Sequence, residues 1–448
     1  MVEAAFYGDD FTGSTDAMVQ FARVGLRAVL LVRLPSASEL RELAERYDVI
    51  GVAGIARSLP PDEQEAELRP VLEALRDLGP RVLQYKVCST ADSSPTRGSI
   101  GRALEIGREV CGPAVVPILI AQPELGRYTV FSHHFAAEAG TIYRLDRQPT
   151  MSTHPATPMH ESDLRHHLSH QTTLPLTALH LTTYTNLPTT YTNLTNPRRP
   201  RQSTRSTSQS STPQSSTPQS STGPALHPTA QSPVVPGGVG AVVLDALTDE
   251  DLHRLGRVIL RDGTAGEVRF VIGSGGMSRA LGLALRPGGG AVGSGTSGAG
   301  GPVLVVSGSQ SRRTAEQIEH ARSAGWIVLP FADDVPRKAV AAIAAGADGV
   351  VVHTNELSPD KLSLVPAGLA DVVRKAAVRR VVVAGGDTSG QVLHQLDVTA
   401  LELARSLCPG VHLCHATSPY FDEVLLKPGQ LGPVTLFTEF QQRSVTSA

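Results

Sequence analysis

The chain has 448 residues, of which 41% are hydrophobic and 18% charged, so it is longer than one ordinary domain and can bury two cores. A formal net charge of -2 excludes the broad positive field of nucleic-acid-binding and membrane-surface proteins, and we expect neither partner. The four cysteines lack zinc-site or disulfide spacing, no apolar run could span a bilayer, and no basic leader precedes the first strand. These features predict a cytoplasmic protein.

The first strand-to-helix turn carries paired carboxylates. An apolar run at the start of the chain predicts a buried strand, and the apolar spacing in "STDAMVQFARVG" predicts a helix. Between them, "GDDFTGSTD" places Asp9 and Asp10 at the carboxyl end of the strand, where open α/β sheets bind ligands. Thr12, Ser14 or Thr15 could be no more than helix caps, but a cap needs only one side-chain oxygen. We therefore predict that Asp9 and Asp10 bind a polar ligand or a metal.

A first α/β domain is predicted over residues 1–181. Short β-branched runs ("RAVLLVRL", "DVIGVAG", "RVLQYKV", "AVVPILIA") alternate with amphipathic stretches such as "PDEQEAELRPVLEALRDLG". This alternation predicts a mainly parallel sheet flanked by helices.

A second polar cluster, "YKVCSTADSSPTRGSIGRA", follows one of these strands. Lys86 stands at the strand end, where its compact charge suits a carboxylate or phosphoryl oxygen, and Arg97 could clamp a carboxylate with two hydrogen bonds. The alternative is that Lys86 extends to solvent and the rest is an ordinary loop. Further along, His166 and His170 share one helical face. Because a solvated histidine-rich face is commoner than a metal site and no Glu stands between them, we predict no metal there.

The composition changes abruptly over residues 182–237, where Ser-Ser-Thr-Pro-Gln units repeat and aliphatic residues nearly vanish. Such a segment cannot bury enough apolar surface to order itself, so it is predicted to be a disordered linker or insertion. Beyond it, buried-strand runs such as "PVLVVSGS" and "RRVVVAGG" predict a second α/β domain over residues 238–448. The predicted fold is thus α/β, with two domains of mainly parallel sheets flanked by helices and joined through the low-complexity segment.

Glycine-rich strand ends recur in this second half: "VIGSGGMS", "VVSGSQSRRT", "VVAGGDTSG" and "LLKPGQLG". Glycines let backbone N–H groups approach a phosphate, and a helix that begins there adds its positive dipole end. Single loops of this kind also serve ordinary tight turns. Their repetition in one domain favours a nucleotide site.

Two common nucleotide motifs are missing. No acidic residue lies between Glu267 and Glu316, where a dinucleotide-binding motif would need one for the ribose hydroxyls. The dipeptide Gly-Lys occurs nowhere in the chain, so there is no Walker A loop. A nucleotide bound here would use another loop geometry.

Taken together, "FYGDDFTGSTDAM", "YKVCST", "GRYTVF", "YRLDRQPTMSTHPATPMHESDLRHHL", "VVSGSQS", "AGGDTSG" and "LLKPGQLG" resemble the four-carbon acid sugar kinase family, the tetronate and 3-oxo-tetronate kinases. The resemblance implies an ATP-dependent kinase that phosphorylates the terminal hydroxyl of threonate, erythronate or a 3-oxo-tetronate. It also implies an amino-terminal domain that binds the acid sugar and a carboxy-terminal domain that binds ATP. The family has Gly-Asn-Leu where this chain has Ser132, His133 and His134. We expect this difference to affect which sugar acid is bound.

The family motifs transfer residue by residue. On the sugar side they give Asp9, Asp10, Lys86, Ser89 and Thr90, to which the residue chemistry adds Arg97. On the ATP side they give Ser307, Ser309, Gly385, Gly386, Asp387, Thr388 and Gly429.

Phosphoryl transfer needs alignment, cations against the phosphate charge and a carboxylate for the hydroxyl proton. Asp9 or Asp10 would be that base, Lys86 would neutralise the substrate carboxylate or the phosphoryl group, and Mg2+ would bridge the phosphates. Two other functions stay open: a non-catalytic binder of sugar acids and nucleotides, and an NAD(P)-dependent oxidoreductase. Assembly into a homo-oligomer is also left open.

Overall fold

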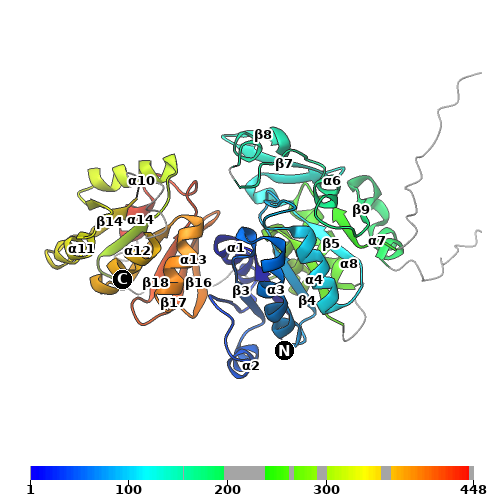
Figure 1. Ribbon diagram of the computed structural model, residues 1–448, viewed down its shortest axis with the longest axis horizontal. Helices are drawn as coiled ribbons and strands as arrows, with labels where there is room; N and C mark the ends of the chain where they lie inside the picture. The colour runs from blue at the N-terminus through cyan, green and yellow to red at the C-terminus, as the bar shows by residue number, and fades with distance from the viewer. Residues whose placement is uncertain are drawn as a thin grey trace, which may run out of the picture.

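The computed structural model describes residues 2–154, 156–195, 238–261, 267–289, 300–354 and 365–442, without the side chains of residues 386–388. Two lobes lie side by side (Figure 1). Within the described residues, one 15-stranded sheet runs through both lobes in the order β13-β14-β12-β15-β18-β17-β16-β2-β3-β1-β4-β11-β5-β10-β9. The predicted α/β class with two mainly parallel regions is confirmed.

The amino-terminal lobe is a parallel sheet with helices on both faces. Its strands are β1 (Ala4–Gly8), β2 (Ala28–Leu31), β3 (Val49–Ala53), β4 (Val82–Lys86), β5 (Val116–Leu119), β9 (Leu176–Leu179), β10 (Ala241–Leu244) and β11 (Arg269–Gly273). Its longer helices are α1 (Phe11–Ala22), α2 (Ala37–Arg46), α3 (Pro61–Arg76), α4 (Ile100–Cys111), α8 (Asp249–Arg261) and α9 (Gly275–Leu285).

A small antiparallel sheet sits above this lobe (Figure 1). It consists of β6 (Arg127–Val130), β7 (His133–Glu138) and β8 (Thr141–Arg144), and the short helices α5 (Pro149–Ser152) and α6 (Leu164–Ser169) follow it.

The carboxy-terminal lobe combines a parallel part with an antiparallel hairpin. Its strands are β12 (Val303–Ser307), β13 (Ile327–Pro330), β14 (Gly349–His353), β15 (Arg380–Ala384), β16 (Ala400–Cys408), β17 (Val411–Thr417) and β18 (Glu423–Lys427). Its helices are α10 (Arg312–Ser323), α11 (Val335–Ala344), α12 (Val365–Ala376), α13 (Gly386–Gln395) and α14 (Leu436–Gln442). None of the helices in the described part of the chain is long and apolar enough to cross a membrane.

The boundary expected at residue 238 is corrected by the strand pairing. β10 pairs with β5 and β9, and β11 pairs with β4 and β5, all in parallel. The chain after the low-complexity segment therefore first completes the amino-terminal lobe, and the carboxy-terminal lobe begins with β12. Buried strands of either lobe look alike in sequence, so only their pairing partners could place them.

The start of the low-complexity segment is also corrected. Residues expected to begin the disordered stretch form a 3-10 helix (Leu181–Asn186) and α7 (Leu187–Thr195), and Tyr184, Leu187 and Tyr191 are buried in the core. Two aromatic side chains and a leucine suffice to hold this otherwise polar stretch against the lobe. Residues 196–237, the rest of the predicted disordered stretch, lie outside the described residues.

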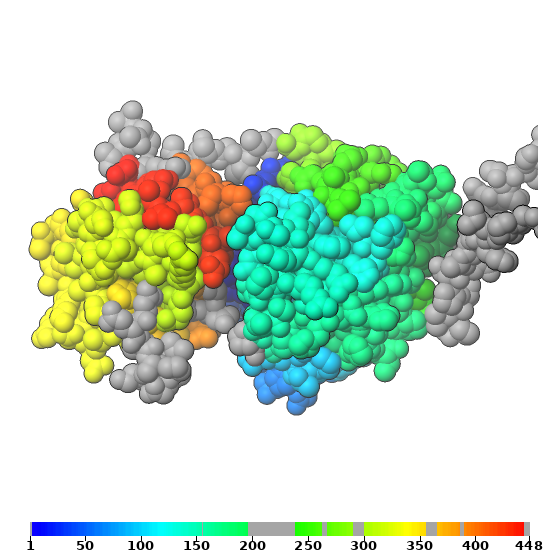
Figure 2. All heavy atoms as spheres, turned by 90° about the horizontal axis from the view of Figure 1, so that it is seen from above, coloured from blue at the N-terminus to red at the C-terminus, as the bar shows by residue number. Residues whose placement is uncertain are grey.

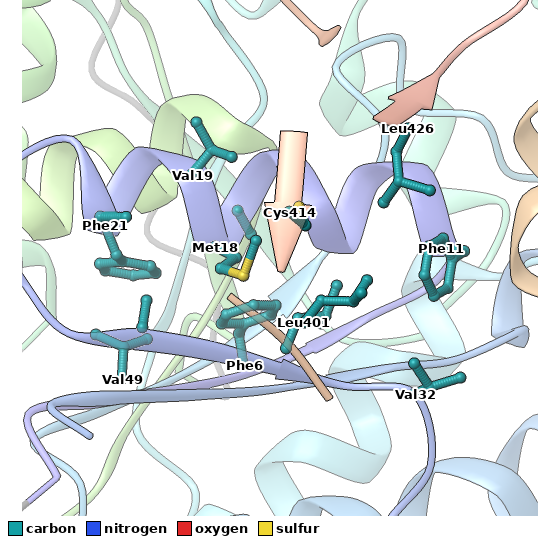
Figure 3. Packing of buried hydrophobic residues seen from close by; sticks show 14 of the residues in the cluster. Phe6, Phe11, Met18, Val19, Phe21, Val32, Val49, Leu401, Cys414 and Leu426 are labelled. Carbon is teal, nitrogen blue, oxygen red and sulfur yellow. The ribbon is translucent and has the colours of Figure 1, made fainter. Parts of the chain in front are cut away.

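The two lobes share one hydrophobic core around α1. Phe6, Phe11 and Met18 of the amino-terminal lobe lie in the same buried cluster as Leu401 and Leu426 of the carboxy-terminal lobe (Figure 3). The sheet also continues across the join, because β16 pairs antiparallel with β2. A shared core and a shared sheet hold the two lobes against each other and position the cleft between them.

Candidate active site

A cavity of about 500 Å³ lies between the lobes. Figure 2 shows the two lobes meeting along a seam, with the yellow-to-red carboxy-terminal lobe against the cyan-to-green and blue amino-terminal lobe. The lining residues come from both: Asp10, Phe11, Thr12, Gly13, Thr15, Asp16, Arg57, Lys86, Cys88, Ser89, Asp92, Gln122, Leu125 and His154 on one side, and Ser389, Gly410, His412, Leu426, Lys427, Pro428, Gly429 and Leu431 on the other.

The two aspartates of the first turn are fixed by one arginine. The Arg57 guanidinium donates to both carboxylate oxygens of Asp9, at 2.7 and 3.1 Å, and to both of Asp10, at 2.9 Å each. Asp10 also caps α1, since its Oδ1 accepts from the Gly13 N–H at 2.9 Å. The helix cap is therefore Asp10 and not Thr12, Ser14 or Thr15. Because Asp10 also lines the cavity, ligand binding by Asp10 stays a prediction.

Asp9 lies beneath the cavity wall and is only 1% exposed. Burial raises the pKa of Asp9 to about 6, and the neighbouring Asp10 adds to the shift, while Arg57 and Lys86 oppose it. Asp9 therefore holds Arg57 in place, and Asp10 is the carboxylate that faces the cavity.

Lys86 ends β4 beside this pair and is 2% exposed. Its Nζ donates to the Val87 carbonyl at 2.9 Å, and it forms no ion pair with a described residue. A side chain at Gly13 would put its Cβ 2.4 Å from Asp10 Oδ1 and 2.7 Å from Lys86 Nζ. Only glycine leaves room between the carboxylate and the ammonium, so the turn sequence preserves an opening between these two charges.

The loop after β4 divides the remaining predicted sugar-site residues. Ser89 lines the cavity. Thr90 is buried behind it, where its hydroxyl donates to Asp92 Oδ1 at 3.0 Å and contacts Cys88 Sγ at 2.9 Å. Arg97 is exposed and does not line the cavity. Of the six predicted sugar-site residues, Asp10, Lys86 and Ser89 line the cavity and Asp9 is buried directly beneath it. Thr90 lies behind Ser89, and Arg97 lies outside the cavity.

Cys88 also lines the cavity. Burial raises the pKa of its thiol to about 11. The thiol therefore stays protonated at neutral pH and is not a nucleophile.

In the carboxy-terminal lobe, the "SGSQS" and "KPGQ" loops are bonded to each other. The Gly429 carbonyl accepts from Ser311 Oγ at 2.5 Å and from Thr314 Oγ1 at 2.9 Å. Ser309 lies at the same junction, with its Oγ accepting from Thr314 Oγ1 at 3.0 Å, while Ser307 is fully buried at the end of β12. Ser307, Ser309 and Gly429 are therefore gathered at one corner, and of these Gly429 lines the cavity.

The "GGDT" loop adds the start of α13 to this corner. Gly385 has φ 122°, a left-handed conformation that favours glycine, and its N–H donates to the Lys427 carbonyl at 3.0 Å. Gly386, Asp387 and Thr388 form the first turn of α13, and Ser389 lines the cavity. The unpaired N–H groups of a helix start suit an anion.

The "GSGG" loop, expected near the nucleotide, lies in the other lobe. Ser274 caps α9, and a Cβ at Gly276 would lie 1.8 Å from the Ala121 carbonyl. A Cβ at Gly275 would lie 2.1 Å from Asp16 Oδ2. These glycines permit close packing, which is the ordinary interpretation of such a loop.

Arg57 and Lys427 are among the cavity residues that were not predicted from the sequence, although the stretches around them were noted. Arg57 follows β3, the strand next to β1, so the shared carboxyl edge of the sheet could have signalled it. Lys427 stands inside the quoted "LLKPGQLG", is 1% exposed, and donates from Nζ to Thr314 Oγ1 at 2.8 Å and to the Pro428 and Gly429 carbonyls at 2.9 Å each. Burial lowers the pKa of Lys427 to about 8, and Arg313 adds to the shift.

The segment Ser132 to His134, which the sequence was expected to link with substrate choice, lies beside the Ser89 loop of the cavity. Ser132 has φ 67°, where glycine is favoured, and its N–H and that of Phe131 donate to the buried Asp245 carboxylate at 2.9 and 2.7 Å. His134 is fully buried: Nε2 donates to the Ser89 carbonyl at 2.8 Å, and Nδ1 accepts from Thr129 Oγ1 at 2.9 Å. Burial lowers the pKa of His134 to about 4, so a neutral imidazole supports the Ser89 loop.

Comparison with known proteins identifies both lobes. Residues 4–281 match a family model described as a sugar-binding N-terminal domain, and residues 304–437 match a nucleotide-binding C-terminal domain. A 3-oxo-isoapionate kinase of Paraburkholderia graminis is 35% identical over 97% of this chain and 93% of its own. A 3-oxo-tetronate kinase of Methylobacterium radiotolerans is 28% identical over 96% of both. A solved structure from Salmonella typhimurium LT2 has the same fold, with a TM-score of 0.75 at 21% identity over 99% of both chains.

These matches confirm the resemblance found in the sequence motifs. The first match also shows the sugar-binding domain continuing past the low-complexity segment, in agreement with the pairing of β10 and β11. The chain belongs to the four-carbon acid sugar kinase family and is a carbohydrate kinase that acts on sugar acids.

Proposed function

We propose that the protein transfers the γ-phosphoryl group of ATP to a hydroxyl group of a 3-oxo sugar acid bound in the cleft between the lobes. The observation that carries the proposal is that one cavity holds Asp10 and Lys86 from the amino-terminal lobe and Lys427 from the carboxy-terminal lobe. A carboxylate and a cation from one lobe and a second cation from the other lobe thus line the space where the phosphoryl group would pass.

Asp10 is the residue that we assign to the attacking hydroxyl. Asp10 lines the cavity, and its orientation is fixed by Arg57 and by the Gly13 N–H. A carboxylate held in this way can align the hydroxyl and accept its proton as the bond to phosphorus forms. Asp9 keeps Arg57 in position from beneath.

The two buried lysines would neutralise the negative charge of the transferred phosphoryl group. Lys86 pairs with no described carboxylate, and Lys427 donates only to neutral oxygens, so both ammonium groups can take phosphate or substrate-carboxylate oxygens without breaking an ion pair. The ATP phosphates would lie against Gly429, the Ser309 loop and the start of α13, where backbone N–H groups replace a Walker loop.

Mg2+ would accompany ATP and supply positive charge to its phosphates. Within the described residues, no three His, Cys, Asp or Glu side chains gather as a metal site. Mg2+ keeps several waters and usually needs only one or two protein carboxylates, so the ion would be held mainly by the nucleotide.

The experiment is a coupled assay of ADP formation with purified protein, ATP and Mg2+, run with 3-oxo-isoapionate, 3-oxo-tetronates, threonate and erythronate. The higher identity to the 3-oxo-isoapionate kinase, 35% against 28%, makes 3-oxo-isoapionate the expected best substrate. Mass spectrometry of the product should show one added phosphate. Binding of an acid without ADP formation would instead favour the non-catalytic alternative.

A further inference from the structure

The β16–β17 hairpin of the carboxy-terminal lobe reaches into the cleft. Its tip carries Gly410, which has φ 73° and lines the cavity, and His412 follows on β17. His412 is 5% exposed and also lines the cavity. A histidine is thus built into the wall of the site from a hairpin that no glycine-loop motif includes.

One ring nitrogen of His412 has no partner. Nδ1 lies 3.1 Å from Ser406 Oγ on the neighbouring strand, whereas Nε2 is buried without a hydrogen bond. Other buried polar atoms of the described residues also lack partners, but His412 is the one such residue that lines the cavity. Because buried polar groups are nearly always satisfied, the partner of Nε2 is expected to arrive with a ligand.

The hydrogen on His412 is expected at Nε2. Burial lowers the pKa of His412 to about 4, so the ring is neutral at neutral pH. The negative field of Asp16 favours a proton on this ring, whereas Arg23 opposes it. Ser406 Oγ and His412 Nδ1 share a hydrogen bond in which either atom can donate. In the arrangement where the hydroxyl donates, Nε2 is an N–H donor suited to a ligand oxygen.

The position of His412 indicates that it contacts the sugar acid rather than the nucleotide. His412 pairs with Leu426 across the β17–β18 ladder, so both side chains lie on the sheet face that packs on α1. Figure 3 shows Leu426 near the start of α1, where Phe11 lies. Lys427, the next residue, points to the opposite face and contacts Thr314 of α10. The charges that act on His412 all belong to the amino-terminal lobe.

We propose that His412 is a specificity residue whose Nε2–H donates a hydrogen bond to an oxygen atom of the bound sugar acid. The inference rests on the proposed function and extends it: the acid-sugar site is completed by the carboxy-terminal lobe. A 3-oxo carbonyl or a carboxylate oxygen is the acceptor chemistry that a neutral donor suits.

The test compares three variants. His412→Phe removes the donor and keeps a planar ring, and His412→Gln restores an N–H near the Nε2 position. His415→Gln is the control, because His415 lies on the same strand but is exposed and outside the cavity. KM for the sugar acid, KM for ATP, kcat and the melting temperature are measured for each, and binding of the acid is measured by calorimetry.

We expect His412→Phe to raise the sugar-acid KM about tenfold or more, the effect of one lost hydrogen bond, with ATP KM and melting temperature little changed. His412→Gln should recover most of the loss, and His415→Gln should match the wild type. If His412→Phe leaves the sugar-acid KM unchanged, the inference about His412 is wrong, although the proposed kinase activity stands. If only the ATP KM rises, His412 contacts the nucleotide instead and the inference is also wrong. If the wild type binds the acid without turnover, the proposed function fails and calorimetry on His412→Phe still decides the inference. If the wild type binds no acid, both fail.

Discussion

Arg57 determines how the paired aspartates of the first turn work. Two carboxylates in sequence repel each other, and the guanidinium that bonds to both offsets this repulsion and fixes the orientation of both groups. The pair therefore divides its tasks, with Asp9 buried as a support and Asp10 at the cavity surface.

The first prediction concerns Asp10. Asn caps a helix almost as well as Asp but cannot accept a proton, so Asp10→Asn should fold normally and lose about 100-fold or more in kcat, with ATP KM little changed. Asp10→Ser is the control, since Ser also caps a helix and lacks the carboxylate. A stable Asp10→Asn variant with near-normal turnover would show that Asp10 does not accept the proton of the hydroxyl group.

The second prediction concerns the ionisation of Asp9. Its pKa is about 6 in the folded protein and about 3.9 in an unfolded chain, so between about pH 4 and 6 the folded state binds more protons and the free energy of unfolding falls as pH rises. Asp9→Asn removes this titration. The melting temperature of the variant minus that of the wild type should therefore increase from about pH 4 to 6 and then level off. Parallel pH curves for the two proteins would contradict the raised pKa.

At the scale of elements, the nucleotide corner is made of loops that brace one another. The Gly429 carbonyl receives hydrogen bonds from Ser311 and Thr314 of the α10 start and from Lys427 of β18. Gly385 ties the start of α13 to β18 through the Lys427 carbonyl. Three strand ends thus form one unit, and a displacement of one loop is passed to the others.

The third prediction tests this unit at Gly429. A Cβ there would lie 2.7 Å from Ser309 Oγ and 3.3 Å from Ser311 Cβ, so Gly429→Val should push the two loops apart and raise the ATP KM about tenfold or more while the sugar-acid KM stays unchanged. Gly300→Val is the matched control, because a Cβ at Gly300 meets nothing within 4 Å. Equal ATP affinity in the two variants would place the nucleotide elsewhere.

At the scale of the whole molecule, the low-complexity segment interrupts the amino-terminal lobe between α7 and β10 rather than linking the two lobes. The described residues before this insertion pack on the lobe through Tyr184, Leu187 and Tyr191, which are buried. Its Ser/Thr/Pro/Gln composition predicts that the remainder is dispensable.

The fourth prediction compares two deletions. Removing residues 198–235 should leave kcat and melting temperature near wild-type values. Removing residues 185–235 also deletes α7 with its buried Leu187 and Tyr191, and should lower stability by about 3–5 kcal/mol or more, the cost of losing a large buried aromatic. Both are measured by urea unfolding and the coupled assay. A large loss from the shorter deletion would show that the insertion packs on the lobe.

Local structure and the chemistry of short motifs could be predicted from the amino-acid sequence. Strand and helix periodicity gave the α/β class, and the short motifs gave the family, the paired aspartates, Lys86 and the glycine loops, because these depend on neighbouring residues. Arg97 lay outside the cavity because loop direction is not encoded in residue type.

Features that depend on partners distant in the chain could be seen only in the folded structure. It placed β10 and β11 in the first lobe, joined the lobes through β16 and β2, and brought Arg57 to Asp9 and Asp10 and Lys427 to the cleft. The sequence of a buried aliphatic strand does not reveal its neighbours, because such a strand can pair with many others. A single Arg or Lys forms no repeating pattern, so its partner cannot be read from the sequence either. Their roles follow only from the contacts that folding creates.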